Sequence, residues 1–204
     1  MNNCADLRES YGRSGLSEDE APLEPWALFE TWFDAAIAAG LREPNAMTLA
    51  TSTPNARIVL MKGYGPSGVT FFTNYESTKG RELEANPHVA LLFFWNELER
   101  QVRLRGTAGK ISREETTIYF RSRPRGSQIG AAVSAQSAVI RNRAELEAQL
   151  SRFGDAEIPV PENWGGYRAE ISEFEFWQGR PNRLHDRLRY RQEGGQWLRE
   201  RLAP

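Results

Sequence analysis

The sequence predicts an α+β protein built around an antiparallel β-barrel with flanking helices. Three observations lead to this prediction. Short strand-like segments recur along the 204 residues, helical segments fall between them in clusters, and Gly or Pro separates neighbouring strands. The length suits a single domain with a sizeable core. We expect a polar, mobile segment over residues 1–21 and one domain over residues 22–204.

The first helix is predicted to begin at Pro25 and to end at Gly40. Its apolar residues recur at i, i+4 spacings, which indicates a stripe that faces a core or an interface. Strand-like residues then dominate six segments: 47–51, 57–62, 69–73, 89–95, 101–111 and 167–177. The segment 89–95 is apolar on both faces, so we expect it at the centre of the sheet.

Turn and cap residues place the remaining elements. Pro66 and Gly68 predict a hairpin between the second and third strands, and Ser77 predicts the N-cap of a helix that ends near residue 84. Further helices are expected over residues 113–121, 127–133 and 143–152. Pro124 should end the first of these, and Ser127 can cap the second. A final hairpin is expected over Gly194-Gly195.

Bulk composition excludes several classes of protein. The formal charge of −1 argues against general nucleic-acid affinity, and no apolar segment has the length of a membrane span. A single cysteine, Cys4, and the lack of a signal-peptide pattern favour the cytoplasm. With only two histidines, far apart, no metal site is expected. No serine-hydrolase, P-loop or dinucleotide-binding motif occurs.

A basic row over residues 183–191 is the most informative local feature. If the row is a strand, alternation puts five basic side chains on one face: Arg183, His185, Arg187, Arg189 and Arg191. Like charges along one face repel, so the row needs solvent or an anion. It therefore indicates either an exposed edge strand or the wall of a site for an anionic ligand, and the row alone favours neither.

Other segments carry groups that suit phosphate. Arg57 and Lys62 are five residues apart, so alternation places them on opposite faces of a strand, where they serve different ligands or are solvated ends. The segment 73–79 leads a strand into a helix N-terminus, where free N–H groups favour an anion, although capping by Ser77 explains it equally well. Tyr119 and Arg123 lie one helical turn apart and can face a common ligand or form a solvated basic turn.

Taken together, these segments resemble the pyridoxine (pyridoxamine) 5′-phosphate oxidase family. The resemblance runs from about Leu7 over nearly the whole chain, and its long ordered motifs are highly specific. The matching segments are RIVLMK at 57–62, FTN at 72–74, ERQV at 99–102, YFRSRPRGSQIG at 119–130, QS at 136–137, WGG at 164–166, EFWQGRPNRLHDR at 175–187 and RLAP at 201–204.

The resemblance implies an FMN-binding split barrel that forms a homodimer with active sites at the subunit interface. Implied FMN-binding residues are Arg57, Ile58, Val59, Leu60, Met61, Lys62, Phe72, Thr73, Thr78, Lys79, Gln101, Gln136, Ser137, Trp177 and Arg187. Implied substrate-binding residues are Arg8, Tyr11, Lys62, Tyr119, Arg123, Ser127, Arg183 and His185, of which Arg183 and His185 would act on the ring chemistry. Arg189 and Arg191 lie beyond the matched motif and are expected to face solvent.

This chain departs from the family pattern at two places. Thr78 stands where the family usually has Arg, which replaces one cation near the FMN phosphate by a hydroxyl and could weaken FMN affinity. The segment 51–57 is several residues shorter than the usual hairpin, which trims an exposed turn. Neither change removes a residue assigned to the chemistry.

The implied activity is a pyridoxal 5′-phosphate synthase of vitamin B6 salvage and biosynthesis. Pyridoxamine 5′-phosphate or pyridoxine 5′-phosphate would be oxidised to pyridoxal 5′-phosphate, with O2 as acceptor and with H2O2, and ammonia from the amine, as products. One alternative is a related flavin oxidase acting on another substrate, such as a phenazine precursor, although Tyr119, Arg123, Ser127 and His185 argue for a phosphorylated one. The other is a non-catalytic protein that binds FMN or pyridoxal phosphate.

Overall fold

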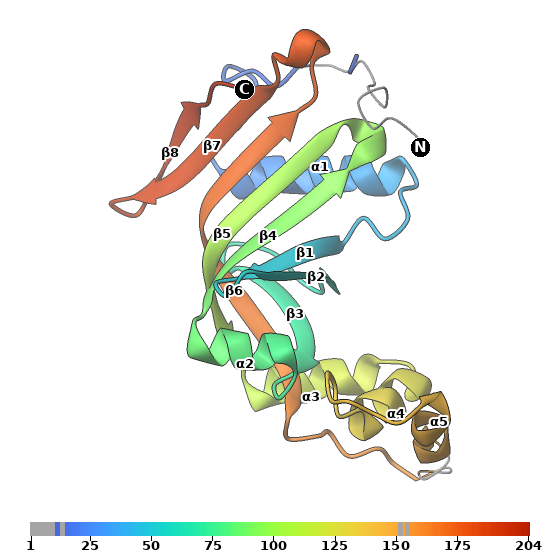
Figure 1. The fold of residues 1–204 in the computed structure, drawn as a ribbon. Coiled ribbons are helices and arrows are strands. Elements are labelled where there is room, and N and C mark those ends of the chain that lie inside the picture. The colour runs from blue at the N-terminus through green and yellow to red at the C-terminus, as the bar shows by residue number, and fades with distance from the viewer. Residues whose placement is uncertain (1–10, 13–14, 151–152, 154–155) are drawn as a thin grey trace. The chain divides into compact units, whose positions relative to one another are not determined.

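The structure of the protein is a computed structural model that describes residues 11–12, 15–150, 153 and 156–204 (Figure 1). Its helices are α1 (Pro25–Ala38), α2 (Thr78–Ala85), α3 (Arg113–Ser122), α4 (Arg125–Val133) and α5 (Arg143–Leu150). Its strands are β1 (Ala46–Thr51), β2 (Asn55–Leu60), β3 (Val69–Asn74), β4 (His88–Trp95), β5 (Arg100–Lys110), β6 (Trp164–Gln178), β7 (Asp186–Glu193) and β8 (Gln196–Arg201). Two short 3-10 turns, η2 (Asn96–Leu98) and η4 (Pro181–Arg183), join strands.

The eight strands form one sheet in the order β2-β1-β4-β5-β6-β7-β8, and β3 pairs with β6 outside this path. The long strand β6 neighbours β5, β7 and β3. Its residues Trp164–Ala169 pair antiparallel with β3, and Glu173–Gln178 pair antiparallel with β7. The predicted α+β class with an antiparallel sheet is therefore confirmed. Strand β4 lies between β1 and β5, as expected for the centre of the sheet.

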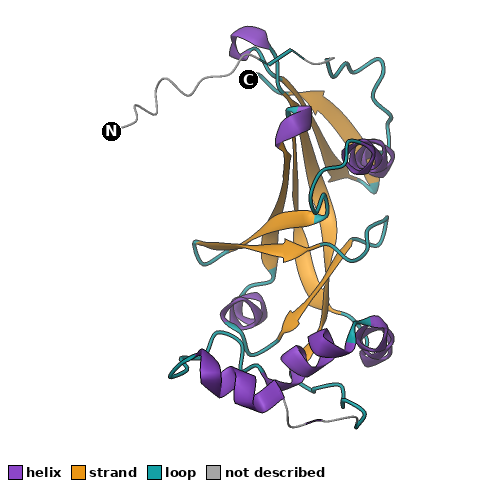
Figure 2. Cartoon of the chain, turned by 90° about the vertical axis from the view of Figure 1, so that its right-hand side faces the viewer, coloured by secondary structure: helices purple, strands orange, loops and turns teal. Residues whose placement is uncertain are grey.

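The chain divides into two compact units, and both helices and strands contribute to each (Figures 1 and 2). The first unit comprises Met1–Leu49, Ala90–Gly106 and Ile171–Pro204. Its core is aromatic: Phe29 and Trp32 of α1 pack edge-on against Phe93 of β4 and Phe176 of β6, and all four are buried. The apolar stripe of the first helix therefore faces this core.

Residues 15–22 run along the β7–β8 hairpin of the first unit. The backbone N–H of Leu16 donates to Asp186 at 3.0 Å, and Arg201 donates to the Leu16 carbonyl at 2.9 Å. Arg201 also forms ion pairs with Glu18 and Asp186. Further on, the Tyr190 hydroxyl donates to the carbonyl of residue 22 at 2.8 Å. These contacts join the segment that precedes α1 to the last two strands.

The second unit comprises Ala50–Val89 and Thr107–Glu170. Phe120, Ile158 and Trp164 form a buried cluster in it. Arginines of α3 and α4 hold the loop before β6 through its carbonyl oxygens. Arg113 of α3 donates to residues 160 and 161 and Arg121 to Ile158, while Arg125 of α4 donates to the carbonyl of residue 156. These contacts fix Trp164 at the start of β6.

A helix cap and a hairpin turn form as the sequence predicts. Ser77 caps α2 by accepting a hydrogen bond from the backbone N–H of Gly80 at 3.2 Å. Gly194 and Gly195 join β7 to β8 with φ values of 59° and 81°, the left-handed conformation that a two-residue hairpin requires.

Two local expectations are wrong. Helix α4 begins at Arg125 with Pro124 at its N-cap, so Ser127 lies inside the first turn and does not cap it. The second and third strands form no extended ladder: among the described residues, an antiparallel bridge between Gly63 and Thr70 joins these segments, and β3 pairs with β6 instead. Strand β4 has the central place expected of it, although Phe94 is 56 % exposed.

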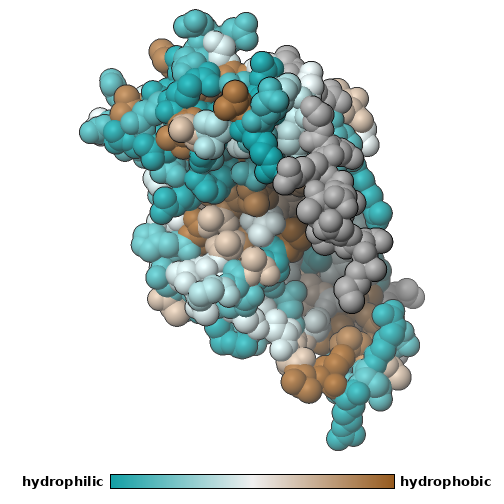
Figure 3. Space-filling view, turned by 45° about the horizontal axis from the view of Figure 1, so that its top comes forward, coloured by the Kyte–Doolittle hydropathy of each residue, from teal (hydrophilic) through white to brown (hydrophobic). Residues whose placement is uncertain are grey.

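The surface is mixed in character. Figure 3 shows one face on which hydrophilic residues predominate and hydrophobic ones form separate patches. Within the described part of the chain, no helix is both long and apolar enough to cross a membrane.

Candidate active site

The second unit contains a cavity of about 620 Å³, a size typical of small-molecule sites. Strands β2 and β3, helices α2, α3 and α4 and the start of β6 supply its walls. The lining residues are Ile58, Val59, Leu60, Lys62, Phe72, Thr73, Asn74, Lys79, Tyr119, Arg123, Pro124, Ser127, Gly130, Ala131, Ser134, Gln136 and Trp164. Most were expected to bind FMN or substrate, so the fold gathers residues from five of the motifs around one cavity.

Arg123 is the most telling side chain in this cavity. Its guanidinium carbon lies 4.6 Å from the centre of the Trp164 ring, and its Nη1 is buried with no hydrogen-bond partner among the described residues. Burial lowers the pKa of Arg123, because water no longer solvates the charge fully. A buried guanidinium nitrogen without a partner is costly, so the cavity is suited to an anionic group that accepts from it.

Aromatic rings line the wall beside this cation. Phe72 stacks on Tyr119 with ring centres 3.8 Å apart and on Trp164 with centres 5.5 Å apart. Burial raises the pKa of the Tyr119 hydroxyl, so Tyr119 stays protonated and can donate to an anion. The cavity thus combines an apolar aromatic wall with a cation, which suits a planar ring that carries an acidic group.

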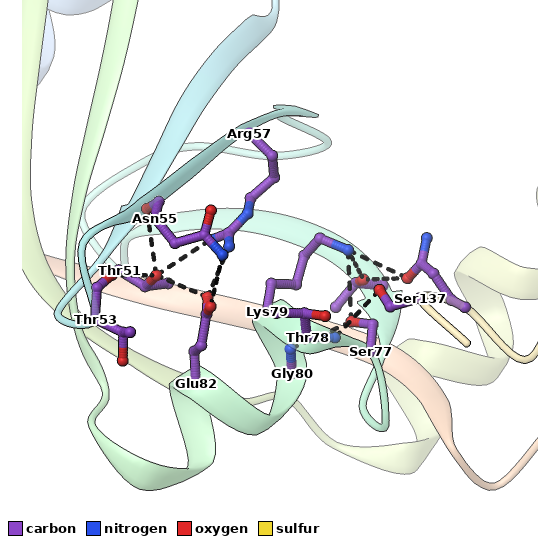
Figure 4. A network of polar contacts seen from close by, with 12 residues as sticks. Thr51, Thr53, Asn55, Arg57, Ser77, Thr78, Lys79, Gly80, Glu82 and Ser137 are labelled. Carbon is purple, nitrogen blue, oxygen red and sulfur yellow. Dashed lines mark hydrogen bonds and ion pairs between the residues drawn. The ribbon is translucent and has the colours of Figure 1, made fainter. Parts of the chain in front are cut away.

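A second polar group lies where β3 leads into α2 (Figure 4). The Lys79 ammonium donates to Thr73 and to Gln136, each at 3.2 Å, and Thr73 itself donates to Gln136 at 3.0 Å. At the first turn of α2, the backbone N–H of Thr78 donates to the Ser137 hydroxyl at 3.2 Å. Desolvation lowers the pKa of Lys79, with a further contribution from the neighbouring Arg57 charge.

Arg57 is held in a network of its own (Figure 4). Its Nη2 donates to Glu82 at 2.7 Å, and its Nη1 donates to the Thr51 hydroxyl at 3.2 Å. Asn55 also donates to Glu82, at 2.8 Å. Arg57 does not line the cavity, and Met61 is buried in the core. Arg57 and Lys62 have different surroundings, and because β2 ends at Leu60, Lys62 lies outside the strand that carries Arg57.

The first unit holds another cluster of expected site residues. Tyr11 packs edge-on against Trp177 and against His185, with ring centres 5.7 Å apart in each pair, and Trp177 lies 4.6 Å from His185. The backbone N–H of Arg180 donates to Nδ1 of His185 at 3.2 Å. Burial lowers the pKa of His185, and the Arg183 charge lowers it further, against Asp186, which raises it. The ring is thus held neutral, with its proton on Nε2.

The basic row does not form one continuous strand face. Strand β7 begins only at Asp186, and Arg183 lies in η4, exposed, with φ of 61°. The preceding Asn182 also has a positive φ, of 56°. The expected alternation of Arg183 and His185 with the later residues is therefore wrong. Such backbone strain in non-glycine residues is typical of functional sites, and here it directs Arg183 away from the ladder.

The remaining arginines of the row are all paired. Arg187 forms an ion pair with Glu175 of β6 at 2.8 Å. Arg189 and Arg191 both pair with Glu200 of β8, at 2.8 and 3.2 Å. Both side chains are about one-third exposed, so they keep contact with solvent, and the shared carboxylate of Glu200 relieves their mutual repulsion.

The structure thus places the expected residues in two groups, one in each unit. Tyr11, Gln101, Arg183, His185, Trp177 and Arg187 belong to the first unit, and the others belong to the second. Arg8 lies outside the described residues. Sequence reasoning assigned no role to Trp164, Asn74, Ser134 or Glu82. Of these, Trp164 and Asn74 carried a signal, because they stand in the WGG and FTN segments that match the family.

Comparison with known proteins agrees with this geometry. Residues 33–155 match the family model described as pyridoxamine 5′-phosphate oxidase, and residues 164–204 match that of the pyridoxine 5′-phosphate oxidase C-terminal dimerisation region. The chain belongs to the pyridoxamine 5′-phosphate oxidase family, as its motifs indicated.

Both curated relatives and solved structures resemble this chain. The relatives from Salinibacter ruber and Pseudomonas paraeruginosa are named pyridoxine/pyridoxamine 5′-phosphate oxidase. The first is 54% identical, with 100% of both chains covered, and the second is 54% identical, with 99% of both covered. Among solved structures, PhzG from Burkholderia lata, in complex with tetrahydrophenazine-1-carboxylic acid, is 31% identical with a TM-score of 0.89 and covers 96% of this chain and 100% of its own. An FMN-binding protein of Nostoc punctiforme, 15% identical with a TM-score of 0.74, covers 90% of this chain and 100% of its own and shares the fold.

Proposed function

We propose that the protein is an FMN-dependent oxidase that converts pyridoxamine 5′-phosphate or pyridoxine 5′-phosphate to pyridoxal 5′-phosphate. The observation that carries the proposal is Arg123, whose buried Nη1 lacks a partner among the described residues beside a stack of aromatic rings. A phosphorylated pyridine supplies both the anion and the flat ring that this wall suits. Relatives that are 54% identical over their whole length carry the corresponding name.

The donor set of the second unit fits a flavin phosphate as well. Lys79, Gln136 and Ser137 provide a cation, an amide and a hydroxyl around the first turn of α2, where the helix dipole favours an anion. When bound, FMN would supply the two-electron redox chemistry of the oxidation, with O2 as the final acceptor. Gln101, Trp177 and Arg187 of the first unit are the further residues proposed to hold it.

The chain itself would contribute binding, orientation and electrostatics. Lys62, Tyr119, Arg123 and Ser127 are proposed to hold the substrate phosphate. Arg183 and His185 are proposed to orient the pyridine ring, with His185 donating from Nε2 because the backbone N–H of Arg180 occupies Nδ1. In this role His185 positions the ring and does not remove a proton. With the amine substrate, ammonia is released when the oxidised product reacts with water.

We also propose a homodimer with active sites at the subunit interface. Support comes from residues 164–204, which match a model described as a dimerisation region. Sedimentation at micromolar concentration should give twice the 23.2 kDa mass of the chain. A monomer that retains full activity would contradict the proposal.

Peroxide formation with each phosphorylated substrate tests the activity directly. Arg123→Leu should raise KM for both substrates about tenfold or more, because a charge-assisted contact to phosphate is lost. Arg143→Ala is the matched control, since Arg143 is 87 % exposed and pairs only with Glu147, one helical turn away. If the flavin-loaded wild type forms no peroxide with either substrate, the proposal fails.

One observation favours a second candidate activity. PhzG, with its phenazine-type carboxylic acid, is 31% identical with a TM-score of 0.89, and Arg123 can equally donate to a carboxylate. Oxidation of tetrahydrophenazine-1-carboxylic acid should therefore be measured beside the phosphorylated substrates. A higher kcat/KM for the carboxylic acid would assign the protein to that chemistry.

A further inference from the structure

A buried carboxylate in the first unit has two arginine partners. Glu175 of β6 is 3 % exposed and forms ion pairs with Arg103 of β5 and Arg187 of β7. Its Oε1 accepts from Nε of Arg187 at 3.0 Å and from Nη2 at 2.8 Å, and its Oε2 accepts from Arg103. Two donors of the Arg187 guanidinium thus converge on one carboxylate oxygen, which holds the position of the group and restricts its rotation.

The choice of partner is specific. In the antiparallel ladder the residue directly opposite Glu175 is Arg189, and Arg187 lies opposite Trp177. Arg189 nevertheless pairs with Glu200 of β8 through both Nε and Nη2. Glu175 therefore pairs with Arg187, its diagonal neighbour on β7, two residues from the position directly opposite.

A third contact completes the hold on Arg187. Its Nη1 donates to the carbonyl oxygen of Ala203 at 2.7 Å, and its own carbonyl accepts from the backbone N–H of Leu202 at 2.9 Å. A guanidinium has five N–H donors. Three are used by Glu175 and Ala203, so two stay available for a ligand within the described part of the chain.

We propose that Glu175 is a positioning residue for Arg187, which it orients toward the flavin. The inference rests on the proposed function, in which Arg187 contacts FMN. Glu175 touches neither FMN nor substrate in this scheme: it holds the guanidinium and restricts its rotation, and the Ala203 carbonyl restricts it further. Without Glu175, the Arg187 side chain would lose conformational entropy each time FMN binds. This cost would weaken FMN binding.

A double-mutant cycle on FMN binding tests this inference. The dissociation constant of FMN is measured by flavin fluorescence for the full-length wild type, Glu175→Gln, Arg187→Ala and the double variant. Glu175→Gln should weaken binding about tenfold, and the same change should have an effect of less than about twofold in the Arg187→Ala background. Glu173→Gln is the matched control: Glu173 lies two residues away on the same strand face and pairs with the exposed Arg105 at 3.6 Å.

The outcomes separate this inference from the proposed function. If the wild type and Glu173→Gln both fail to bind FMN, the proposed function fails. If both bind FMN, two results would overturn the positioning role. One is that Glu175→Gln binds FMN as tightly as the wild type or more tightly. The other is that Glu175→Gln weakens FMN binding just as much in the Arg187→Ala background. If Glu175→Gln does not fold, Glu175→Asp replaces it in the cycle. The aspartate keeps the charge but is shorter by one methylene. We expect it to weaken FMN binding in the same way, and only where Arg187 is present.

Discussion

The Arg123 guanidinium carbon lies 4.6 Å from the centre of the Trp164 ring, in a cavity where Nη1 of the same side chain has no hydrogen-bond partner among the described residues. The ring face attracts the cation without occupying any of its N–H donors. Trp164 thus holds Arg123 in place and leaves its hydrogen-bonding capacity for a ligand.

Trp164→Phe should raise KM for the phosphorylated substrates about threefold with little change in kcat, because a Phe ring attracts a cation more weakly than an indole does. Steady-state peroxide assays measure both constants. Trp197→Phe, an aromatic replacement of a residue that packs edge-on against Phe174 in the other unit, serves as control. An unchanged KM in Trp164→Phe would show that the indole does not support the anion-binding role of Arg123.

His185 should titrate with a midpoint below 6.5, because burial and the Arg183 charge disfavour the imidazolium. Its neutral form should carry the proton on Nε2, since Nδ1 accepts from the backbone N–H of Arg180. The chain has only two histidines, so nitrogen NMR spectra of the wild type and of His88→Asn assign both rings. A midpoint above 6.5, or a proton on Nδ1, would contradict this account.

Glu82→Ala should lower the free energy of unfolding by about 2 kcal/mol, because Arg57, Asn55 and Thr51 would all lose an acceptor in a partly buried network. Glu84→Ala on the same helix is the control. Glu84 is 69 % exposed and pairs with Lys110, so about 0.5 kcal/mol or less is expected. Urea unfolding followed by circular dichroism compares the two, and equal losses would refute the distinction.

Acid should remove the stabilisation that Glu18 provides. Its hydrogen bonds and ion pair with Arg201 lower the pKa of this carboxyl from 4.5 to about 2. Because the folded value lies below the unfolded one, the contribution is complete above about pH 4.5 and is lost as the pH falls toward 2. The difference in Tm between wild type and Glu18→Gln should therefore be constant near neutral pH and shrink below 4.5. A difference that is independent of pH would rule out the charge as its source.

The sequence allowed prediction of those elements whose determinants are local. Pro25 begins α1, Ser77 caps α2, and the Gly194-Gly195 pair makes the final hairpin, each by chemistry contained in a few neighbouring residues. Tyr119 and Arg123, one helical turn apart, do face the same cavity. In these cases spacing alone was enough.

Predictions failed where distant residues decide the structure. Glu200 neutralises Arg189 and Arg191 from another strand, so the basic row needs no external anion there. The positive φ of Asn182 and Arg183 breaks the expected strand. Asn tolerates this conformation, but neither residue type requires it. Alternation of side chains could not reveal either effect, because both depend on tertiary contacts.

The contact between Arg187 and Ala203 uses a main-chain oxygen, and this limits how evolution or an engineer could alter it. Any residue at position 203 offers the same carbonyl, so replacing the alanine side chain should be tolerated. A deletion between β8 and residue 203, or a chain that stops before it, would withdraw the oxygen altogether. At this place the protein would therefore be sensitive to the path and length of its backbone and largely indifferent to the identity of the residue.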